Sequence, residues 1–466
     1  MRYRQVGLGL ILLSEVINLE KQIYKKESTT YAVGIDIGTT TVSAVVYDIK
    51  NKTQIKSYST FHNSYVICKE YSEQSVEKII EVASSILYQI LDSYKNIISI
   101  GITGQMHGIL YVDKNGNSIS NLINWQDKRG DKALENLKTP CQQIFDITGE
   151  KAYTGYGIIT HFYNHEKNIT PPNVSKIVTI MDYFAMKICG LSETVMHTSV
   201  ASSLGLFDNK NHQFKYEKIS SLGIDTRILP SVTDKSVIIG KCRGIPVSIP
   251  IGDNQASFLG AVKENENSML VNIGTGSQVS AVCSYFESDD DIEQRPFIEG
   301  KYLACGSALS GGSAYALLEG FFREYAKEIG INDTPQYEIM NKLAYECYKK
   351  GEKGLVVDTS FSGKRSNPHH RGAILDIGKE NFTPSNLILG VIRGMCYELY
   401  ELYDKFPIKK SCMIASGGAV EKIPILKAIL SDTFCMEVSR SNIKEEAAEG
   451  AALFSLLAIK NISCKE

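Results

Sequence analysis

The sequence lacks the features that would mark a zinc-binding, disulfide-bonded or membrane-spanning protein. Its eleven cysteines are scattered singly, with no C-x-x-C pair and no His-Cys cluster at metal-ligand spacing. This distribution suits a reducing compartment and argues against a disulfide framework or a zinc site. No segment is apolar over a length that could span a bilayer. We therefore expect a cytoplasmic protein that does not enter a membrane.

The sequence also lacks a strong charge of either sign. Lys and Arg total 50, Asp and Glu total 52, and the net charge at pH 7 is -2. This balance gives no electrostatic reason to expect nucleic acid or an acidic membrane as a partner. Hydrophobic residues make up 43% and charged residues 22%, as in ordinary globular proteins. A chain of 466 residues is too long for one core, so about two or three domains are expected.

The N-terminal segment, residues 1–30, superficially resembles a signal peptide. It carries two arginines and an apolar run from Val6 to Leu13. The run is short, Glu15 follows it closely, and no small-x-small cleavage site is evident. We therefore interpret residues 1–30 as an N-terminal extension rather than as a secretion signal.

Strands and helices alternate along the rest of the chain, which predicts an α/β protein. Residues 97–110 are expected to form a buried strand that ends in a glycine-flanked loop. Residues 176–190 have apolar residues at helical spacing and end in Gly190, which suits a helix C-cap. The stretch 199–250 is rich in turns, so we place a domain boundary near residue 250. No low-complexity linker follows, and we expect two domains in close contact with a cleft between them.

Two stretches share one pattern, "GIDIGTTTVSAVV" from Gly34 and "NIGTGSQVSAV" from Asn272. In each, an apolar strand breaks at Gly and hydroxyl residues and then resumes as a second strand. Such a turn exposes backbone N–H groups and hydroxyls that can surround phosphate oxygens, because glycine allows close approach. Asp36 in the first stretch could hold Mg²⁺, directly or through water. A single hairpin could be an ordinary turn with an edge-strand acid, but the repetition favours binding of a triphosphate.

The motifs, taken in order, resemble those of the FGGY carbohydrate kinases, within the actin-like, ribonuclease H-like ATPases. The resemblance runs from about Tyr31 to about Ser455. It rests on "GIDIGTTTVSAVV", "GITGQMHGIL", "NWQDKRG", "IGDNQASFLGAV", "NIGTGSQVS", "FSGKRSNPHHRG", "SGGAV" and "EEAAEGAALFS". It implies an α/β fold of two ribonuclease H-like (actin-like) ATPase domains, each with a mixed five-stranded sheet. Residues 31–250 would bind sugar and phosphate, residues 251–466 would bind nucleotide, and the cleft between them would hold both ligands.

The resemblance implies ATP and Mg²⁺ as cofactors. Asp36 is similar to the magnesium-associated acid of the family. The residues that match its ATP-binding positions are Thr39, Thr40, Gly274, Thr275, Gly276, Gly311, Gly312, Gly417 and Gly418. An asparagine common in the family shortly after the Gly417–Gly418 pair is missing here, which leaves the adenine contacts open.

The resemblance also implies a sugar site and a catalytic base. The residues that match sugar contacts are Gln105, Met106, His107, Trp125, Asp127 and Asn254. Asp253 aligns with the base. Asp253 also precedes the apolar run "ASFLGAV", so we expect it at a helix N-terminus, where a carboxylate stays ionised. Phosphoryl transfer needs such an acceptor for the hydroxyl proton. The plainer alternatives are a helix cap for Asp253, a hydrogen-bonded loop residue for His107, and a core position for Trp125, the only tryptophan.

The motifs around the sugar site favour a ketose as substrate. "GQMHG" is typical of kinases for xylulose and sedoheptulose, whereas glycerol kinases carry Arg-Glu where Met106 and His107 stand. "NWQDKRG" resembles sedoheptulokinases more than xylulokinases, although "FSGKRSNPHHRG" is shared with xylulokinases and gluconokinases. We therefore expect an ATP-dependent kinase for the primary hydroxyl of sedoheptulose, with xylulose second.

Two other functions stay open at this point. One is a non-catalytic actin-like ATPase, against which "GQMHG" and "GDNQA" argue. The other is an inactive sensor, against which Asp36 and Asp253 argue. The expected partners are a small-molecule sugar and a nucleotide. The sequence leaves the oligomeric state open, a homodimer included.

Overall fold

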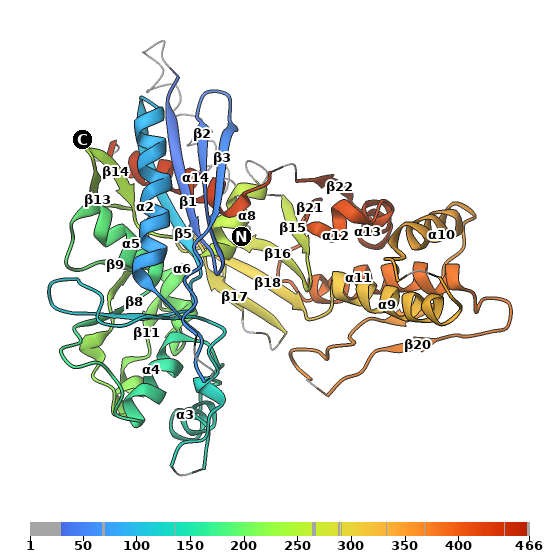
Figure 1. Cartoon of the computed structure of the whole chain (residues 1–466), viewed down its shortest axis with the longest axis horizontal. Coiled ribbons are helices and arrows are strands. Elements are labelled where there is room, and N and C mark those ends of the chain that lie inside the picture. Colours follow the sequence, from blue (N-terminus) through green and yellow to red (C-terminus); the bar gives the residue numbers. More distant parts are fainter. Residues whose placement is uncertain are drawn as a thin grey trace, which may run out of the picture. The chain divides into compact units, whose positions relative to one another are not determined.

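The structure is a computed structural model that describes residues 29–463, except 68, 69, 136, 263–266, 288, 290, 332, 368 and 442. Most of the predicted N-terminal extension, residues 1–28, lies outside the described residues. The chain divides into two compact units (Figure 1). Unit 1 holds the described residues of 1–264, 295–301 and 443–466. Unit 2 holds those of 265–294 and 302–442.

The units differ in extent from the two domains expected on either side of residue 250. Helix α8 (Asp253–Val262), which follows that residue, belongs to unit 1. So does the C-terminal helix α14 (Glu446–Ser463), which packs extensively against α8. This packing is close because a Cβ added at Gly450 would lie 1.7 Å from the carbonyl oxygen of Ala256. The candidate base Asp253 is therefore built into the same unit as Asp36.

Unit 1 is built on a six-stranded mixed sheet. Its strand order is β13 (Ile238–Cys242), β14 (Ile245–Ser248), β5 (Ile97–Gly104), β1 (Tyr31–Ile37), β2 (Thr41–Asp48) and β3 (Thr53–Phe61). Strands β1, β2 and β3 form an antiparallel meander, and β5 runs parallel to β1. Strand β14 is parallel to β5, and β13 pairs antiparallel at the edge.

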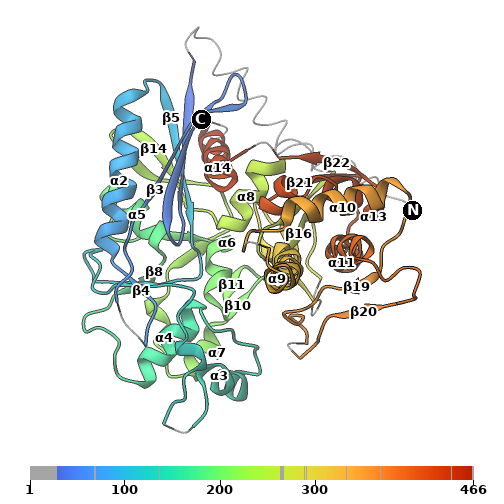
Figure 2. The same cartoon turned by 45° about the vertical axis from the view of Figure 1, so that its right-hand side comes forward.

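Helices cover both faces of this sheet (Figure 2). Successive residues of a strand point to opposite faces of the sheet. On one face, Val33 and Ile35 belong to the core cluster that contains the apolar side of α2 (Val76–Ser93). Gly34 faces α14, since a Cβ there would lie 1.8 Å from the carbonyl oxygen of Ala448. The absence of a side chain at Gly34 lets α14 lie directly on the sheet.

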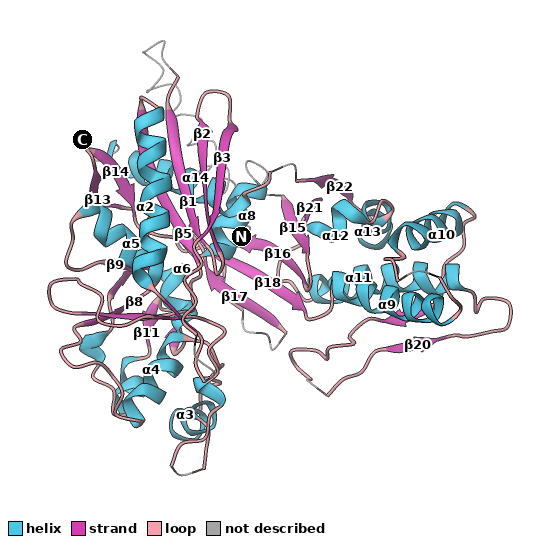
Figure 3. Cartoon of the chain, in the orientation of Figure 1, coloured by secondary structure: helices cyan, strands magenta, loops and turns pink. Residues whose placement is uncertain are grey.

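Unit 2 repeats this plan. Its strand order is β17 (Ile292–Pro296), β18 (Tyr302–Ala308), β16 (Ser277–Cys283), β15 (Ser268–Ile273), β21 (Cys412–Ser416) and β22 (Glu437–Arg440). Strands β15, β16 and β18 form the meander, while β21 and β22 continue it in parallel (Figure 3). The prediction of five strands in each sheet was wrong, because each sheet has a sixth strand at one edge. This strand is β13 in unit 1 and β17 in unit 2.

The remaining elements surround the two sheets. In unit 1 they are β4 (Glu73–Gln74), β6 (Leu110–Val112), β7 (Leu122–Ile123), α3 (Pro140–Thr148), α4 (Gly157–Glu166), β8 (Lys176–Val178), α5 (Ile180–Cys189), β9 (Val195–His197), α6 (Thr198–Ala201), β10 (Phe207–Asp208), β11 (Gln213–Phe214), α7 (Tyr216–Ser221) and β12 (Ser231–Thr233). In unit 2 they are α9 (Gly312–Glu328), α10 (Tyr337–Lys349), β19 (Val356–Asp358), β20 (Ala373–Leu375), α11 (Pro384–Asp404), α12 (Gly418–Lys422) and α13 (Leu426–Phe434).

The helix expected over residues 176–190 begins later than predicted. Residues Lys176–Val178 form strand β8, which pairs with β6. Thr179 then caps α5 by accepting a hydrogen bond from the backbone of Asp182. The predicted end is confirmed, because Gly190 is the C-cap in the left-handed conformation, with φ 68°. Within the described part of the chain, no helix combines the length and apolar character needed to cross a membrane.

Candidate active site

A cavity of about 400 Å³ lies in unit 1, where the end of β1 meets the start of α8. The residues that line it are Asp36, Gly38, Thr39, Gln105, Met106, His107, Trp125, Asp253, Asn254, Ser257 and Ala447. Eight of them are candidates from the sequence, and segments far apart in the chain bring them together. The fold therefore gathers the predicted acid, loop hydroxyl, base and sugar-site residues around one space.

Two carboxylates face this cavity, Asp36 from the end of β1 and Asp253 from the first residue of α8. Burial, and to a smaller extent the negative charges of Asp253 and Glu445, together raise the pKa of Asp36 to about 7. Burial also raises the pKa of Asp253, while Arg295 opposes the rise. The predicted helix N-terminus is confirmed. Backbone N–H groups at this helix start lower the pKa of Asp253 as expected, but burial outweighs them, so the net shift is upward.

The paired acids suit a divalent cation. Among the described residues, no group of three or more His, Cys, Asp and Glu could hold a metal by itself. Mg²⁺, however, is commonly bound by one or two carboxylates together with substrate phosphates and water. The mutual repulsion of Asp36 and Asp253 is what a cation between or beside them would relieve. The oxygen donors present therefore fit Mg²⁺ better than they fit zinc.

Asp253 is held by bonds to the segment that precedes it. The backbone N–H of Ile251 donates to Ile102, and the Thr103 hydroxyl donates to the carbonyl oxygen of Ile251 at 2.7 Å. The backbone N–H of Gly252 donates to the hydroxyl of Ser199 at 3.0 Å. These bonds fix the two residues that lead into α8. The carboxylate of Asp253 is thus aimed by strand β5 and by α6.

Thr39 in the β1–β2 loop is bonded at two of its atoms. The Gln74 side chain donates to the carbonyl oxygen of Thr39 at 2.8 Å. The Trp125 indole donates to the hydroxyl of Thr39 at 2.9 Å. The Thr39 hydroxyl therefore accepts from Trp125 and keeps its own proton for a further acceptor, such as a phosphate oxygen. Thr40 is exposed and does not line the cavity.

The other side of the cavity is formed by the predicted sugar-site residues. The Nδ1 atom of His107 donates to the carbonyl oxygen of Ser203 at 2.8 Å, and its ring stacks on Tyr156 with centroids 4.5 Å apart. Met106 is buried, at 1% exposure. Trp125 is 46% exposed and lines the cavity. The alternative prediction, that Trp125 fills the core, was therefore wrong.

Asp127 does not line the cavity. Its side chain is 1% exposed, and its two oxygens accept hydrogen bonds from the backbones of Ser72 and Arg129 at 2.8 and 2.9 Å. These bonds hold the loop that carries Trp125. The structure therefore places Asp127 behind the cavity wall, where it supports a lining residue.

The predicted nucleotide glycines form a separate group in unit 2. The backbone N–H of Gly311 donates to Thr275, and that of Gly312 donates to Gly274 at 2.8 Å. These bonds join the β15–β16 loop to the N-terminus of α9. Close packing also explains Gly276, where a Cβ would lie 3.1 Å from the carbonyl oxygen of Ala308.

The second glycine pair joins the same group. Gly417 has φ 96°, and a Cβ there would lie 2.5 Å from the carbonyl oxygen of Ile273, so only glycine fits. At Gly418 a Cβ would meet nothing within 4 Å. Thr275 and Gly418 are the exposed members of this group, which lies beside the start of the 17-residue helix α9.

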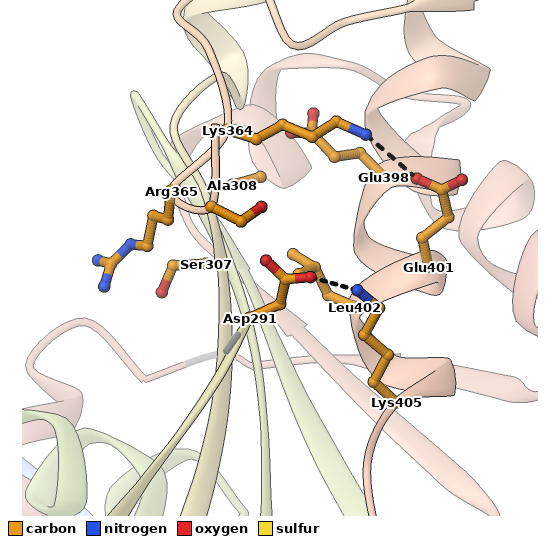
Figure 4. A pocket seen from close by; sticks show the side chains of 10 residues that line it. Asp291, Ser307, Ala308, Lys364, Arg365, Glu398, Glu401, Leu402 and Lys405 are labelled. Carbon is orange, nitrogen blue, oxygen red and sulfur yellow. Dashed lines mark hydrogen bonds and ion pairs between the residues drawn. The ribbon is translucent and has the colours of Figure 1, made fainter. Parts of the chain in front are cut away.

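Unit 2 also contains a small charged cavity of about 80 Å³ (Figure 4). Lys405 pairs with Asp291, and Lys364 pairs with Glu401 at 3.7 Å. Lys364 belongs to the motif "FSGKRSNPHHRG", in which the sequence analysis identified no site residue. The structure shows that it reaches the nucleotide glycines, because the backbone of Ser362 donates to the side chain of Ser310, next to Gly311.

Several residues of the site were missed by the sequence analysis. Ser257 and Ala447 line the cavity, Glu445 and Arg295 act on the two carboxylates, and Gln74 holds Thr39. Glu445 lies in the motif "EEAAEG", which could have indicated it. Gln74 lies in a two-residue strand, and no signal in the sequence marked it.

Both halves of the chain match one protein family. The description "FGGY family of carbohydrate kinases, N-terminal domain" matches residues 31–260, and the corresponding C-terminal domain matches residues 271–459. The chain belongs to the FGGY family of carbohydrate kinases. The expected resemblance is thereby confirmed over nearly the whole chain.

Individual relatives differ in the substrates that their names give. The chain is 22% identical to a sedoheptulokinase of Homo sapiens, over 91% of this chain and 97% of that protein. It is 24% identical to a xylulose kinase of Staphylococcus xylosus, over 92% and 90%. The structure of Plasmodium falciparum glycerol kinase with ADP matches with a TM-score of 0.75 and 18% identity, over 93% and 90%. The two units therefore have the predicted actin-like ATPase fold.

Proposed function

We propose that this FGGY family member transfers the γ-phosphate of ATP to the primary hydroxyl of a ketose. The observation that carries the proposal is the cavity of unit 1. It combines a candidate base, Asp253, and a second acid, Asp36, with the side chains of Gln105, His107 and Trp125. A polar cavity of this kind suits a polyhydroxylated ligand, because its polar groups can pair with hydroxyls and its aromatic ring can contact the carbon skeleton.

In the proposed reaction the Asp253 carboxylate accepts the proton of the attacking sugar hydroxyl. The oxygen forms a bond to the γ-phosphorus while the bond from that phosphorus to the β-phosphate oxygen breaks, which leaves ADP and a sugar phosphate. The protein supplies positioning and charge stabilisation, which is most of what phosphoryl transfer requires. A base with a raised pKa is suited to this step, because it holds the proton once it has accepted it.

The proposal assigns ATP to the two groups of loop residues. Thr39 would donate its hydroxyl proton to a phosphate oxygen, and the backbones of Gly274, Gly311 and Gly418 would surround the other phosphates and the nucleoside. Asp36 would hold Mg²⁺, which supplies charge neutralisation on the phosphates. The cleft expected between the two domains, a homodimer and a cytoplasmic location stay predictions.

We propose sedoheptulose as the preferred ketose and xylulose as the alternative. The "NWQD" segment supports sedoheptulose, and its Trp125 is exposed at the cavity wall rather than buried in the core. The Met106–His107 pair supports a ketose over glycerol. Relatives named for sedoheptulose and for xylulose match at similar identities, 22% and 24%, so their names do not choose between the two sugars.

The test is ADP release by the purified protein with a panel of sugars. We expect the fastest release with sedoheptulose, slower release with xylulose and negligible release with glycerol. Faster release with xylulose would replace the first substrate by the second. Equal rates with glycerol and ketoses would overturn the roles of Met106 and His107. ADP release that no sugar stimulates would favour a non-catalytic actin-like ATPase instead.

A further inference from the structure

A chain of two buried side-chain amides connects the cavity to the β1–β2 loop. Gln105 lines the cavity and donates through Nε2 to the Oε1 atom of Gln74 at 3.0 Å. Gln74 donates through its own Nε2 to the backbone carbonyl oxygen of Thr39 at 2.8 Å. Gln74 is 0% exposed and Gln105 is 4% exposed. Both amides are thus shielded from water, which would otherwise compete for their hydrogen bonds.

The direction of this chain is fixed by its last acceptor. A backbone carbonyl can only accept, so Gln74 must turn its NH₂ group toward Thr39 and its oxygen toward Gln105. Gln105 must then turn its own NH₂ group toward Gln74. Its Oε1 atom is left as a buried acceptor that has no hydrogen-bond partner among the described residues. A buried acceptor of this kind is costly unless a donor such as a ligand hydroxyl reaches it.

We propose that Gln74 is a positioning residue that connects the sugar cavity to the β1–β2 loop, whose Thr39 is proposed to bind a phosphate of ATP. Through Gln105 it orients an acceptor for a sugar hydroxyl, and through Thr39 it holds the loop beside Asp36. The backbone N–H of Gln105 also donates to Ile37 at 3.0 Å, which joins the same two segments a second time. This inference rests on the proposed sugar kinase activity and adds a residue that does not line the cavity itself.

The test uses Gln74→Met, Gln105→Met and the double variant, because Met is close to Gln in size and lacks its amide. The sugar dissociation constant is measured by calorimetry, and kcat by ADP release with both substrates saturating. We expect each single variant to raise the sugar dissociation constant about 10-fold, the typical effect of one lost buried hydrogen bond. The double variant should raise it no further, since both changes break the same chain.

The kcat values should separate the two residues. Gln74→Met also frees Thr39, so its kcat should fall roughly 10- to 100-fold, whereas Gln105→Met should change kcat less than about 3-fold. The double variant should keep the kcat of Gln74→Met. Additive effects on the sugar dissociation constant would overturn the proposal. So would a Gln74→Met enzyme with the kcat of the unmodified protein.

A matched control separates positioning from a loss of stability. Asn386 is a buried amide of unit 2, 6% exposed, whose side-chain oxygen accepts a hydrogen bond from the Cys347 thiol at 3.2 Å. Asn386→Leu should lower the melting temperature as Gln74→Met does, with the sugar dissociation constant and kcat unchanged. Equal kinetic losses in both variants would reduce Gln74 to a structural residue.

Three further outcomes are assigned in advance. If Gln74→Met does not fold, Gln74→Asn carries the same kinetic expectation, because it keeps the amide but shortens its reach. If the unmodified protein phosphorylates no sugar, the proposed function fails. If the unmodified protein is active and Gln74→Met matches it in kcat, only the role of Gln74 fails.

Discussion

The two hairpins that share a sequence pattern differ at one decisive position. Asp36 is the penultimate residue of β1, and Asn272 is the penultimate residue of β15. Each strand is followed by a glycine loop and pairs with an antiparallel partner and a parallel one. The same place in the same fold therefore carries an acid in unit 1 and a neutral amide in unit 2.

The neighbouring parallel strand explains what this difference does. In unit 2 the residue beside Asn272 is Ser416, and the Asn272 side chain donates to its hydroxyl at 2.9 Å. In unit 1 the residue beside Asp36 is Thr103, whose hydroxyl instead donates to Ile251, two residues before Asp253. In unit 2 the Asn272 amide therefore has a hydrogen-bond partner on the neighbouring strand. Unit 1 leaves its acid facing a cavity and uses the neighbouring hydroxyl to position a second acid.

The largest effect should follow from removing the second acid. Asp253→Asn keeps the size of the side chain but loses the proton acceptor, so kcat should fall by about 100- to 10,000-fold. Nucleotide affinity should persist, because the glycine loops of unit 2 are unchanged. Turnover and ATP binding by the purified variant measure both expectations. A variant that keeps more than about a tenth of its turnover would mean that the base lies elsewhere.

Asp182→Asn is the matched control for this change. Asp182 is also an acid in the first turn of a helix, and burial raises its pKa to about 7. It is bonded to Thr179 and does not line the cavity. Its turnover should therefore stay within about 2-fold of the unmodified protein, as expected for a residue outside the reacting groups.

A smaller effect is expected from exchanging the two hairpin residues. Asp36→Asn should lower turnover roughly 10- to 100-fold, because one ligand of the proposed Mg²⁺ is lost, and added Mg²⁺ should partly restore it. Asn272→Asp should leave the proton transfer intact but weaken ATP binding, since it adds a negative charge beside the proposed phosphate loop. Kinetics at varied Mg²⁺ and ATP distinguish the two. Equal effects of both substitutions on ATP binding would contradict the proposal that Asp36 acts through Mg²⁺ and the loop beside Asn272 acts on ATP.

Asp36→Asn should lower turnover but increase the stability of the fold at high pH. A carboxyl whose pKa is raised from 3.8 to about 7 on folding binds its proton more tightly in the folded state. Its contribution to stability is present below about pH 4 and is lost as the pH rises through about 7. Asp36→Asn should therefore raise the melting temperature at pH 8 and have little effect at pH 4. Thermal unfolding without Mg²⁺ at the two pH values checks the sign, which a lower melting temperature at pH 8 would contradict.

The fold was predictable where the signals are local. The glycine and hydroxyl pattern after Asp36 and Asn272 marked both hairpins, and the apolar run after Asp253 marked the start of α8. The expectation of a helix over 176–190 failed at its beginning because pairing of β8 with β6 decides that segment, and this contact is distant in the sequence. The return of α14 to unit 1 is likewise a long-range event that no local pattern encodes.

The site was predictable for residues that contact the cavity and less so for those that support them. Met106, His107 and Trp125 lie in recognisable motifs and line the cavity. Gln74 acts through the atoms of other residues, and such a role depends on three-dimensional contacts alone. Burial is equally invisible in a sequence. For this reason the sequence did not reveal that burial raises the pKa of Asp253, although its place at the start of α8 was confirmed.

The smallest effect should come from the charged cavity of unit 2, where lysine and acidic side chains are paired with one another. The side chains of Lys364 and Glu401 are 35% and 49% exposed, and their atoms are 3.7 Å apart, so the pair should contribute less than about 1 kcal/mol. Lys364→Glu should lower the melting temperature slightly, and the double exchange with Glu401→Lys should restore it. High salt should erase the difference, because exposed charges are screened. Turnover should stay within about 2-fold throughout, as for surface changes away from a site. A large loss of turnover that the double exchange does not repair would place Lys364 among the groups that act on the substrate, and the contrast between the two units would then fail at this cavity.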